Sequence, residues 1–173
     1  MSEAPADLTD LITELIARLS DRGETIATAE SLTGGLIGAM ITAVSGASAV
    51  YRGGVISYAT DLKATLAGVS PRTLREHGAV AAPTAVEMAT GVAARCEATW
   101  GIAVTGVAGP DPQEGHPPGT VFVAVARPAD VWGGASPDSD VCLRELSLVG
   151  DRASIRQQTV EAALRQASRV CAS

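Results

Sequence analysis

Two residues that could carry out chemistry together lie far apart in the sequence, Ser31 and Lys63. Lys63 is the only lysine among thirteen basic residues, the other twelve being arginine. Arginine keeps its charge in proteins, whereas burial or neighbouring cations can make a lysine neutral, so that it can act as a base. A coding bias towards arginine could also have left one lysine by chance. Lys63 is therefore a candidate base, and it requires a nucleophile to activate.

Ser31 lies just before the turn Thr33-Gly34-Gly35, after which a helix is expected to begin. Unpaired amides at a helix N-terminus can stabilise an anion or a developing oxyanion, so these three residues are candidate oxyanion and substrate-binding residues. A hydroxyl beside such amides is the arrangement that acyl transfer requires. The alternative is that Ser31 or Thr33 only caps the helix, since both residue types are common N-caps.

A serine nucleophile requires a base, and the sequence offers two kinds. The histidines are His77 and His116, and neither accompanies a G-x-S-x-G nucleophile elbow. A neutral Lys63 can take the serine proton, and Tyr58 can relay it or fix the lysine geometry, as in serine-lysine hydrolases without histidine. The predicted catalytic residues are Ser31, Tyr58 and Lys63. A packing role for Tyr58 and a Ser/His esterase that uses His116 remain alternatives.

A second glycine-bearing loop and two arginines are candidates for substrate binding. Thr105 and Gly106 begin a loop at a strand end, where open α/β sheets usually bind ligands. The motif is weak, and a plain turn fits it about as well. Arg152 and Arg156 occupy the start of the last predicted helix and could reach a phosphate, although exposed arginines are common. Ser48 is a further candidate for a phosphate contact.

Composition limits the class of protein. The chain has 173 residues, 46% of them hydrophobic, and a formal net charge of -6. This length suits a single domain over residues 1–173, and the negative charge disfavours nucleic acid or an anionic membrane as a partner. No apolar run reaches the ~20 residues of a membrane span, and the acidic N-terminus does not resemble a signal peptide. We expect a cytoplasmic protein. The few, scattered cysteines and histidines predict no metal site, and we expect no cofactor.

Hydrophobic periodicity and turn residues predict alternating helices and strands. Helices are expected over 7–21, 36–44, 60–67, 71–77, 83–99 and 152–172, and strands over 25–29, 51–58, 101–105, 120–127 and 140–149. Thr84 and Glu87 are spaced as a capping box, and Asp151 is expected to cap the last helix. Strands separated by helices, with one late antiparallel hairpin, indicate a three-layer α/β/α sandwich with a mixed, mostly parallel sheet.

A set of motifs runs in order along nearly the whole chain. They are Thr28-Ala29-Glu30-Ser31-Leu32-Thr33-Gly34-Gly35, Gly53-Gly54-Val55-Ile56-Ser57-Tyr58 with Lys63, Gly78-Ala79-Val80, Glu87-Met88-Ala89, Thr105-Gly106-Val107-Ala108-Gly109-Pro110-Asp111 and Pro118-Gly119-Thr120-Val121. This set resembles the CinA C-terminal domain family. The resemblance implies a metal-independent amidohydrolase that converts nicotinamide mononucleotide to nicotinic acid mononucleotide and ammonia, in NAD recycling. It also implies that Ser31 is the nucleophile, Lys63 the base and Tyr58 their catalytic partner.

The chain departs from the family pattern at two places. Ala81 and Ala82 stand where many relatives carry a serine and an acidic residue, and residues 112–117 differ from a lysine-containing loop. These changes concern the rim of the pocket rather than the catalytic trio. Longer relatives carry an extra N-terminal domain, so we expect the stand-alone form. The alternative function is a catalytically silent nucleotide-binding or regulatory protein in competence or DNA-damage responses. The sequence leaves the oligomeric state open, a homo-oligomer included.

Overall fold

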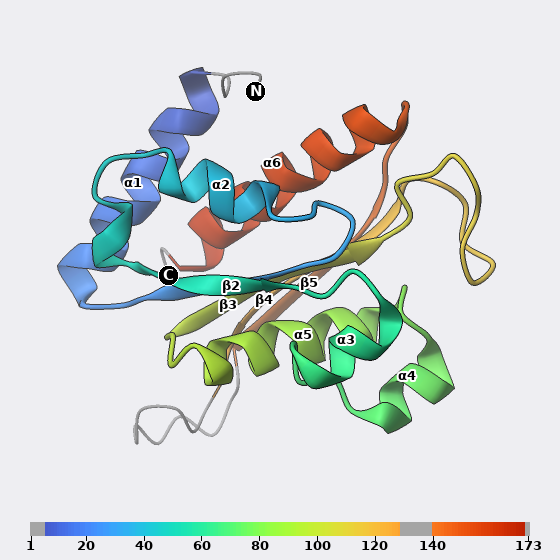
Figure 1. Cartoon of the computed structure of the whole chain (residues 1–173). Helices are drawn as coiled ribbons and strands as arrows, with labels where there is room; N and C mark the ends of the chain where they lie inside the picture. The colour runs from blue at the N-terminus through green and yellow to red at the C-terminus, as the bar shows by residue number, and fades with distance from the viewer. Residues whose placement is uncertain (1–5, 129–139, 172–173) are drawn as a thin grey trace.

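The protein is built on a five-stranded sheet with helices on both faces (Figure 1). The computed structural model describes residues 6–128 and 140–171. The strands are β1 (Ile26–Glu30), β2 (Tyr51–Ile56), β3 (Trp100–Gly106), β4 (Thr120–Arg127) and β5 (Asp140–Ser147), in the order β2-β1-β3-β4-β5. β1 pairs in parallel with β2 and β3, whereas β4 pairs antiparallel with β3 and β5. Four of these strands therefore run in one direction, and the predicted mixed, mostly parallel sheet is confirmed.

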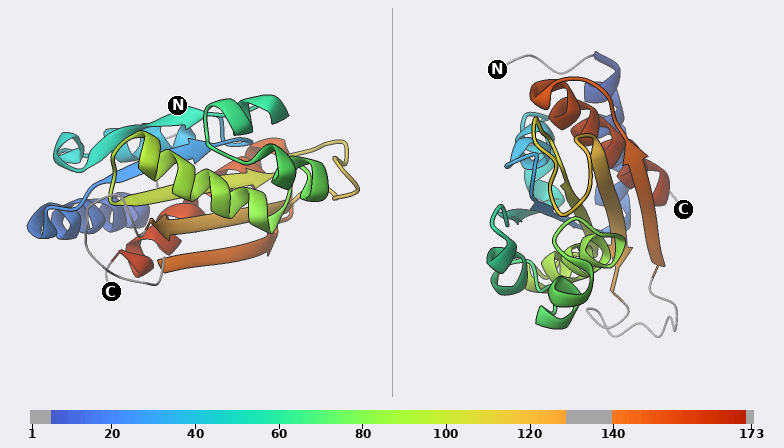
Figure 2. Two further views of the ribbon diagram at one scale, coloured as in Figure 1. Left: turned by 90° about the horizontal axis from the view of Figure 1, so that it is seen from below. Right: turned by 90° about the vertical axis from the view of Figure 1, so that its right-hand side faces the viewer.

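The helices form the two outer layers. One face carries α1 (Ala6–Arg22), α2 (Leu36–Thr42) and α6 (Arg152–Val170), and the other carries α3 (Thr60–Thr65), α4 (Pro71–His77) and α5 (Ala82–Arg95). A short 3₁₀ helix, η1 (Ala47–Ala49), precedes β2. The view from below shows α5 running along the sheet, with α3 and α4 near its start (Figure 2). The predicted three-layer α/β/α sandwich is thus confirmed.

The two faces of the sheet carry side chains of different size. Because side chains alternate along a strand, Ile102 and Val104 point to the α1, α2 and α6 layer, while Ala103 points to α5. Gly101 has no side chain, and a Cβ there would collide with the carbonyl oxygen of Ala89 on α5. Small residues therefore let α5 approach the sheet closely, whereas branched residues fill the thicker layer opposite.

Some predicted boundaries and caps differ in the structure. β2 ends at Ile56 instead of reaching Tyr58, and α5 covers Ala82–Arg95. The predicted capping box is wrong, because Thr84 donates to the carbonyl of Gly78 while Glu87 accepts from Ser70. Asp151 does cap α6, accepting from the amide of Ser154 at 2.8 Å. The predicted end of this helix at Ala172 lies outside the described residues.

The ends of β1, β2 and β3 meet at one edge of the sheet. Glu30 is in register with Ile56 on β2 and with Val104 on β3. Residues that follow β1 and β2, at 31 and 57–58, therefore come together with the end of β3, at 105–106, although they are distant in sequence. Parallel strands place their carboxyl ends side by side, and this edge is where ligands bind in open α/β sheets. None of the helices in the described part of the chain combines the length and the apolar run needed to span a bilayer.

Candidate active site

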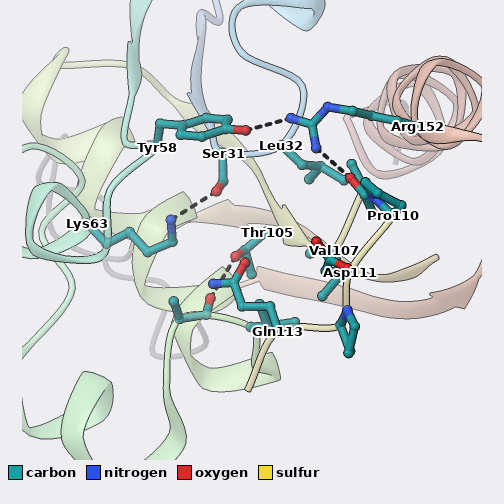
Figure 3. A pocket seen from close by; sticks show the side chains of 16 residues that line it. Ser31, Leu32, Tyr58, Lys63, Thr105, Val107, Pro110, Asp111, Gln113 and Arg152 are labelled. Atoms are coloured by element: carbon teal, nitrogen blue, oxygen red, sulfur yellow. Dashed lines mark hydrogen bonds between the residues drawn. The ribbon is translucent and has the colours of Figure 1, made fainter. Parts of the chain in front are cut away.

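Ser31 and Lys63 are in direct contact. The Nζ atom of Lys63 donates to Ser31 Oγ at 2.9 Å and to the carbonyl oxygen of Ser57 at 2.7 Å (Figure 3). Ser31 comes directly after β1, Ser57 directly after β2, and Lys63 from α3. The sheet register therefore brings the Ser31 hydroxyl to the amine, while the Ser57 carbonyl fixes where the amine points.

Lys63 is buried although it is charged in its ordinary state. Its side chain is 2% exposed, which makes it one of the largest fully buried side chains in the described part of the chain. Burial lowers the pKa of Lys63 from 10.5 to about 8, since desolvation disfavours the ammonium form; the Glu114 carboxylate opposes this shift. A lysine with a pKa near 8 is partly neutral at physiological pH and can accept a proton.

A second buried charge, Glu30, lies on the other side of Ser31. Glu30 is 1% exposed and its carboxylate accepts hydrogen bonds from the hydroxyl of Thr33 and from the amides of Gly35, Ile37 and Gly38. The N-cap position of α2 is Gly35, with φ 99°, and it has no side-chain cap of its own. Glu30 therefore satisfies the amides at the start of α2, and Ser31 does not cap this helix.

Tyr58 lies at the mouth of the cavity with its hydroxyl bound to an arginine. Arg152, at the start of α6, donates to Tyr58 Oη at 2.6 Å and to the carbonyl of Gly109 at 2.8 Å. Figure 3 shows the Tyr58 hydroxyl pointing to Arg152, away from the Ser31–Lys63 contact. Tyr58 is 58% exposed, so much of this residue is open to solvent. Arg152 joins three segments across this mouth: the end of β2, the loop after β3, and α6.

These residues line a cavity of about 290 Å³. Its floor contains Ser31 and Lys63, and one wall is the segment Ala79–Val80, which precedes α5. The Thr105 hydroxyl donates to the carbonyl of Ala79 at 2.6 Å and so joins β3 to that wall. Another wall is the end of β3 at Gly106 with the loop that follows, residues 107–113, and Arg152 completes the rim. The arrangement can present a serine hydroxyl, a neutral amine and a guanidinium to one small molecule.

Known proteins are similar to this chain in sequence and in fold. The model of the CinA C-terminal domain matches residues 8–171. The chain belongs to the CinA C-terminal domain family. A "CinA-like protein" from Frankia casuarinae is 46% identical over 158 residues, which cover 91% of this chain and 34% of that protein. The chain thus spans about a third of the length of the curated relatives it matches.

CinA relatives of known structure are similar over their full length. A competence/damage inducible protein from Agrobacterium tumefaciens is 34% identical, with a TM-score of 0.88 over 98% of this chain and 99% of that one. A CinA superfamily protein from Klebsiella pneumoniae is 30% identical, with a TM-score of 0.85 over 95% of this chain and 98% of that one. The expected family is therefore confirmed.

The CinA fold brings together about half of the predicted site residues. The cavity is lined by Ser31, Tyr58, Lys63, Thr105, Gly106 and Arg152, together with residues of the loop after β3. Thr33, Gly34, Gly35, Ser48 and Arg156 are not among its lining residues. Their predicted role in substrate binding stays a prediction, and the structure gives all five of them other contacts or another position, the Thr33 hydroxyl being bound to Glu30.

The remaining residues of this group bind other backbone or side-chain groups, or lie far from the cavity. The amide of Gly34 donates to the carbonyl of Ser31, and that of Gly35 donates to Glu30. Arg156 donates to the carbonyls of Leu32 and Thr33 at 2.9 Å each, so it holds the turn after Ser31 instead of facing the cavity. Ser48 lies in η1, before β2, whereas the site is at the opposite end of that strand.

Sequence reasoning missed two acidic residues near the site. Glu30 lies inside a motif in which only the serine, the threonine and the glycines are predicted to have a role. Glu114 lies in a loop that is predicted to form the rim of the pocket. A glutamate at the end of an apolar strand, directly before a turn to a helix, is a signal that could have indicated the α2 cap.

The histidine alternative finds no support in the geometry. The ring of His116 packs edge-on against that of Phe122, with 6.3 Å between the ring centroids, and His116 is not among the residues that line the cavity. Within residues 6–128 and 140–171, no group of three His, Cys, Asp or Glu side chains could hold a metal ion.

Proposed function

We propose that this CinA-family chain is an amidohydrolase that cleaves the carboxamide of nicotinamide mononucleotide to nicotinic acid mononucleotide and ammonia. The observation that carries the proposal is the buried contact of 2.9 Å between Lys63 Nζ and Ser31 Oγ. A serine hydroxyl is a weak nucleophile until a neighbouring base takes its proton. The lowered pKa of Lys63, about 8, makes that base available.

The chemistry needs only groups that this cavity contains, plus water. The neutral amine of Lys63 takes the Ser31 proton while Oγ bonds to the carboxamide carbon. The C–N bond then breaks, and the ammonium of Lys63 returns the proton to the leaving nitrogen, which departs as ammonia. Water attacks the acyl-serine ester and gives one proton to Lys63, which passes it to Ser31 as the ester bond breaks. The acid product loses its remaining proton to solvent and leaves as the carboxylate.

The amide of Leu32 is our candidate donor to the developing oxyanion. Leu32 lines the cavity directly after the nucleophile, and its amide has no hydrogen-bond acceptor within the described part of the chain. The residue after a nucleophilic serine supplies such a donor in other hydrolases. This assignment replaces the amides of Gly34 and Gly35, which already donate to Ser31 and Glu30.

Arg152 is our candidate for the substrate phosphate. Its guanidinium lies at the rim of the cavity and donates there to one phenol and one carbonyl, both neutral acceptors. A phosphate is a stronger partner for a guanidinium than either of these, so the nucleotide would displace them. Release of the Tyr58 hydroxyl from Arg152 would then let Tyr58 turn towards Ser31 and Lys63.

The direct test is ammonia release from nicotinamide mononucleotide by the purified protein in the presence of a chelator. We expect turnover in the wild type and a loss of about 10³-fold or more in Ser31→Ala. Ser20→Ala, which removes an exposed hydroxyl of α1, is the matched control and should keep the wild-type rate. Absence of turnover in the wild type on this substrate would refute the proposal and favour a nucleotide-binding or regulatory role.

A further inference from the structure

One side chain joins the two walls of the cavity. Glu114, in the loop between β3 and β4, accepts through Oε2 from the amide of Ala79 at 2.8 Å and from that of Val80 at 3.0 Å. Ala79 and Val80 form one wall, and the residues of the same loop just before Glu114, up to Gln113, form the other. A carboxylate therefore links one wall of the cavity to the backbone of the neighbouring wall.

The segment that Glu114 holds is also held from the sheet. The Thr105 hydroxyl donates to the carbonyl of Ala79, so one residue of the wall is bound at its amide by Glu114 and at its carbonyl by Thr105. Gly78, just before it, has φ 82°, and a Cβ at this position would collide with the Glu114 carboxylate. A glycine at position 78 thus leaves the space that the carboxylate occupies.

We propose that Glu114 is a positioning residue, which fixes the loop after β3 and the Ala79–Val80 wall around Ser31 and Lys63. It has no direct contact with either of these two residues and acts through the backbone that it binds. The inference rests on the Ser31–Lys63 chemistry proposed above. Glu114 belongs to residues 112–117, the part of the loop that departs from the family pattern.

The charge of Glu114 supports this placement. Its carboxylate raises the pKa of Lys63 and so partly offsets the effect of burial. The titratable or charged side chains that line the cavity besides Lys63 are Tyr58, Asp111 and Arg152. Glu114 therefore acts on the site in two separable ways, by hydrogen bonds to the wall and by its field at the amine.

Two substitutions separate these effects. Both amides donate to the same oxygen of Glu114, so the single carbonyl oxygen of Glu114→Gln can accept both while the charge is lost. Glu114→Ala loses the charge and the hydrogen bonds together. Glu145→Gln is the matched control, because it removes one carboxylate from β5, at the edge of the sheet farthest from β2.

Three measurements test the proposal. Lys63 is the only lysine, so protein labelled with ¹³Cε-lysine gives one side-chain signal whose pH titration reports its pKa. Hydrogen exchange at the amides of Ala79 and Val80 reports whether the wall is held. Values of kcat and KM for nicotinamide mononucleotide at pH 9, where neutral Lys63 predominates, report the geometry without the change in protonation.

We expect the pKa of Lys63 to fall in both Glu114 variants and to stay unchanged in Glu145→Gln. Amide exchange should accelerate in Glu114→Ala alone, with a loss of roughly tenfold to a hundredfold in kcat/KM, as for a slightly misplaced active site. Glu114→Gln should keep most of its activity at pH 9. Wild-type exchange and wild-type kcat/KM in Glu114→Ala would overturn the inference. If the wild type does not hydrolyse this substrate, the proposed function fails, whereas the titration and the exchange still decide the role of Glu114.

Discussion

Glu30 and Lys63 are both almost fully buried next to Ser31, yet they differ in the partners that compensate their burial. Glu30 accepts four hydrogen bonds, three of them from backbone amides at the start of α2. Lys63 makes two hydrogen bonds, both to neutral oxygens. A buried carboxyl group with several hydrogen-bond donors stabilises the local structure, whereas a buried amine without a bonded carboxylate is destabilised in its charged form.

The two arginines at the start of α6 differ in a similar way. Arg156 holds the carbonyls of Leu32 and Thr33 and so fixes the turn after the nucleophile. Arg152, one turn earlier, lies at the cavity rim and binds a phenol and a carbonyl that an anion could replace. In each pair one residue builds the site and the other is available to the substrate. This contrast predicts which substitutions change rate and which change stability.

The largest effect should come from removing the base. Lys63→Met keeps an unbranched side chain but cannot accept a proton, so amidase activity should fall by about 10² to 10⁴-fold, the range for loss of a general base. Lys63→Arg should not restore the rate, because a guanidinium does not release its proton at working pH. Steady-state ammonia release measures both. Substantial activity in either variant would mean that another group takes the Ser31 proton.

The same Lys63→Met protein should not be less stable than the wild type at pH 7. The native-state pKa of Lys63 lies near 8, below its ordinary value of 10.5, so below pH 8 the native state carries the full cost of burying the ammonium. That cost is on the order of 3 kcal/mol and disappears as the pH rises from 8 towards 10.5. Urea unfolding of the wild type and of Lys63→Met at pH 7 and pH 10 would measure this cost as a difference in the free energy of unfolding. A large loss of stability in Lys63→Met would place Lys63 with Glu30 as a structural residue.

The pH dependence of wild-type activity should follow the lysine. In the proposed mechanism neutral Lys63 is the reactive form, and the pKa of Lys63 is about 8. We therefore expect kcat/KM to rise about tenfold per pH unit below pH 8 and to level off above it. A profile that is flat between pH 6 and pH 8 would show that neutral Lys63 is not required.

Arg152 and Arg156 should differ in the parameter that they affect. Arg152→Ala removes the proposed phosphate contact, so KM for the nucleotide should rise roughly tenfold or more, the cost of losing one charged hydrogen bond. Activity on the uncharged riboside should change little, because this substrate has no phosphate to bind. Arg156→Ala should instead lower the melting temperature. An equal loss on nucleotide and riboside in Arg152→Ala would argue against phosphate recognition by this residue.

The smallest effect on rate should come from Glu30. Glu30→Gln keeps the shape but replaces one acceptor oxygen by an amide that faces backbone donors, so we expect a loss of about 1–3 kcal/mol in the free energy of unfolding. The folded fraction should retain a rate within about tenfold of the wild type, which is less than the loss of a general base would cause. Denaturant titration and single-turnover kinetics check the two parts. A stable variant with a rate reduced more than a hundredfold would give Glu30 a part in the chemistry.

Local sequence patterns were sufficient to predict much of the fold. The amphipathic period of α1, the cap at Asp151 and the alternation of helices and strands predicted the layers and the late hairpin. The error at Thr84 and Glu87 arose because both side chains find partners outside helix α5, at Gly78 and Ser70. Propensity and spacing carry no information about such contacts.

The sequence by itself determined the order of the elements and the residue types available for chemistry: a lone lysine, a serine before a glycine turn and two arginines at the start of one helix. Only the tertiary structure decided which of them share a cavity. The parallel register of β1, β2 and β3 aligns their ends, and this alignment brings Lys63 to Ser31 across 32 positions of chain. Which amides of the turn remain open was also a tertiary outcome, since Glu30 occupies those of Gly35, Ile37 and Gly38. A buried polar group binds the nearest available partner in space, and sequence spacing does not specify that distance.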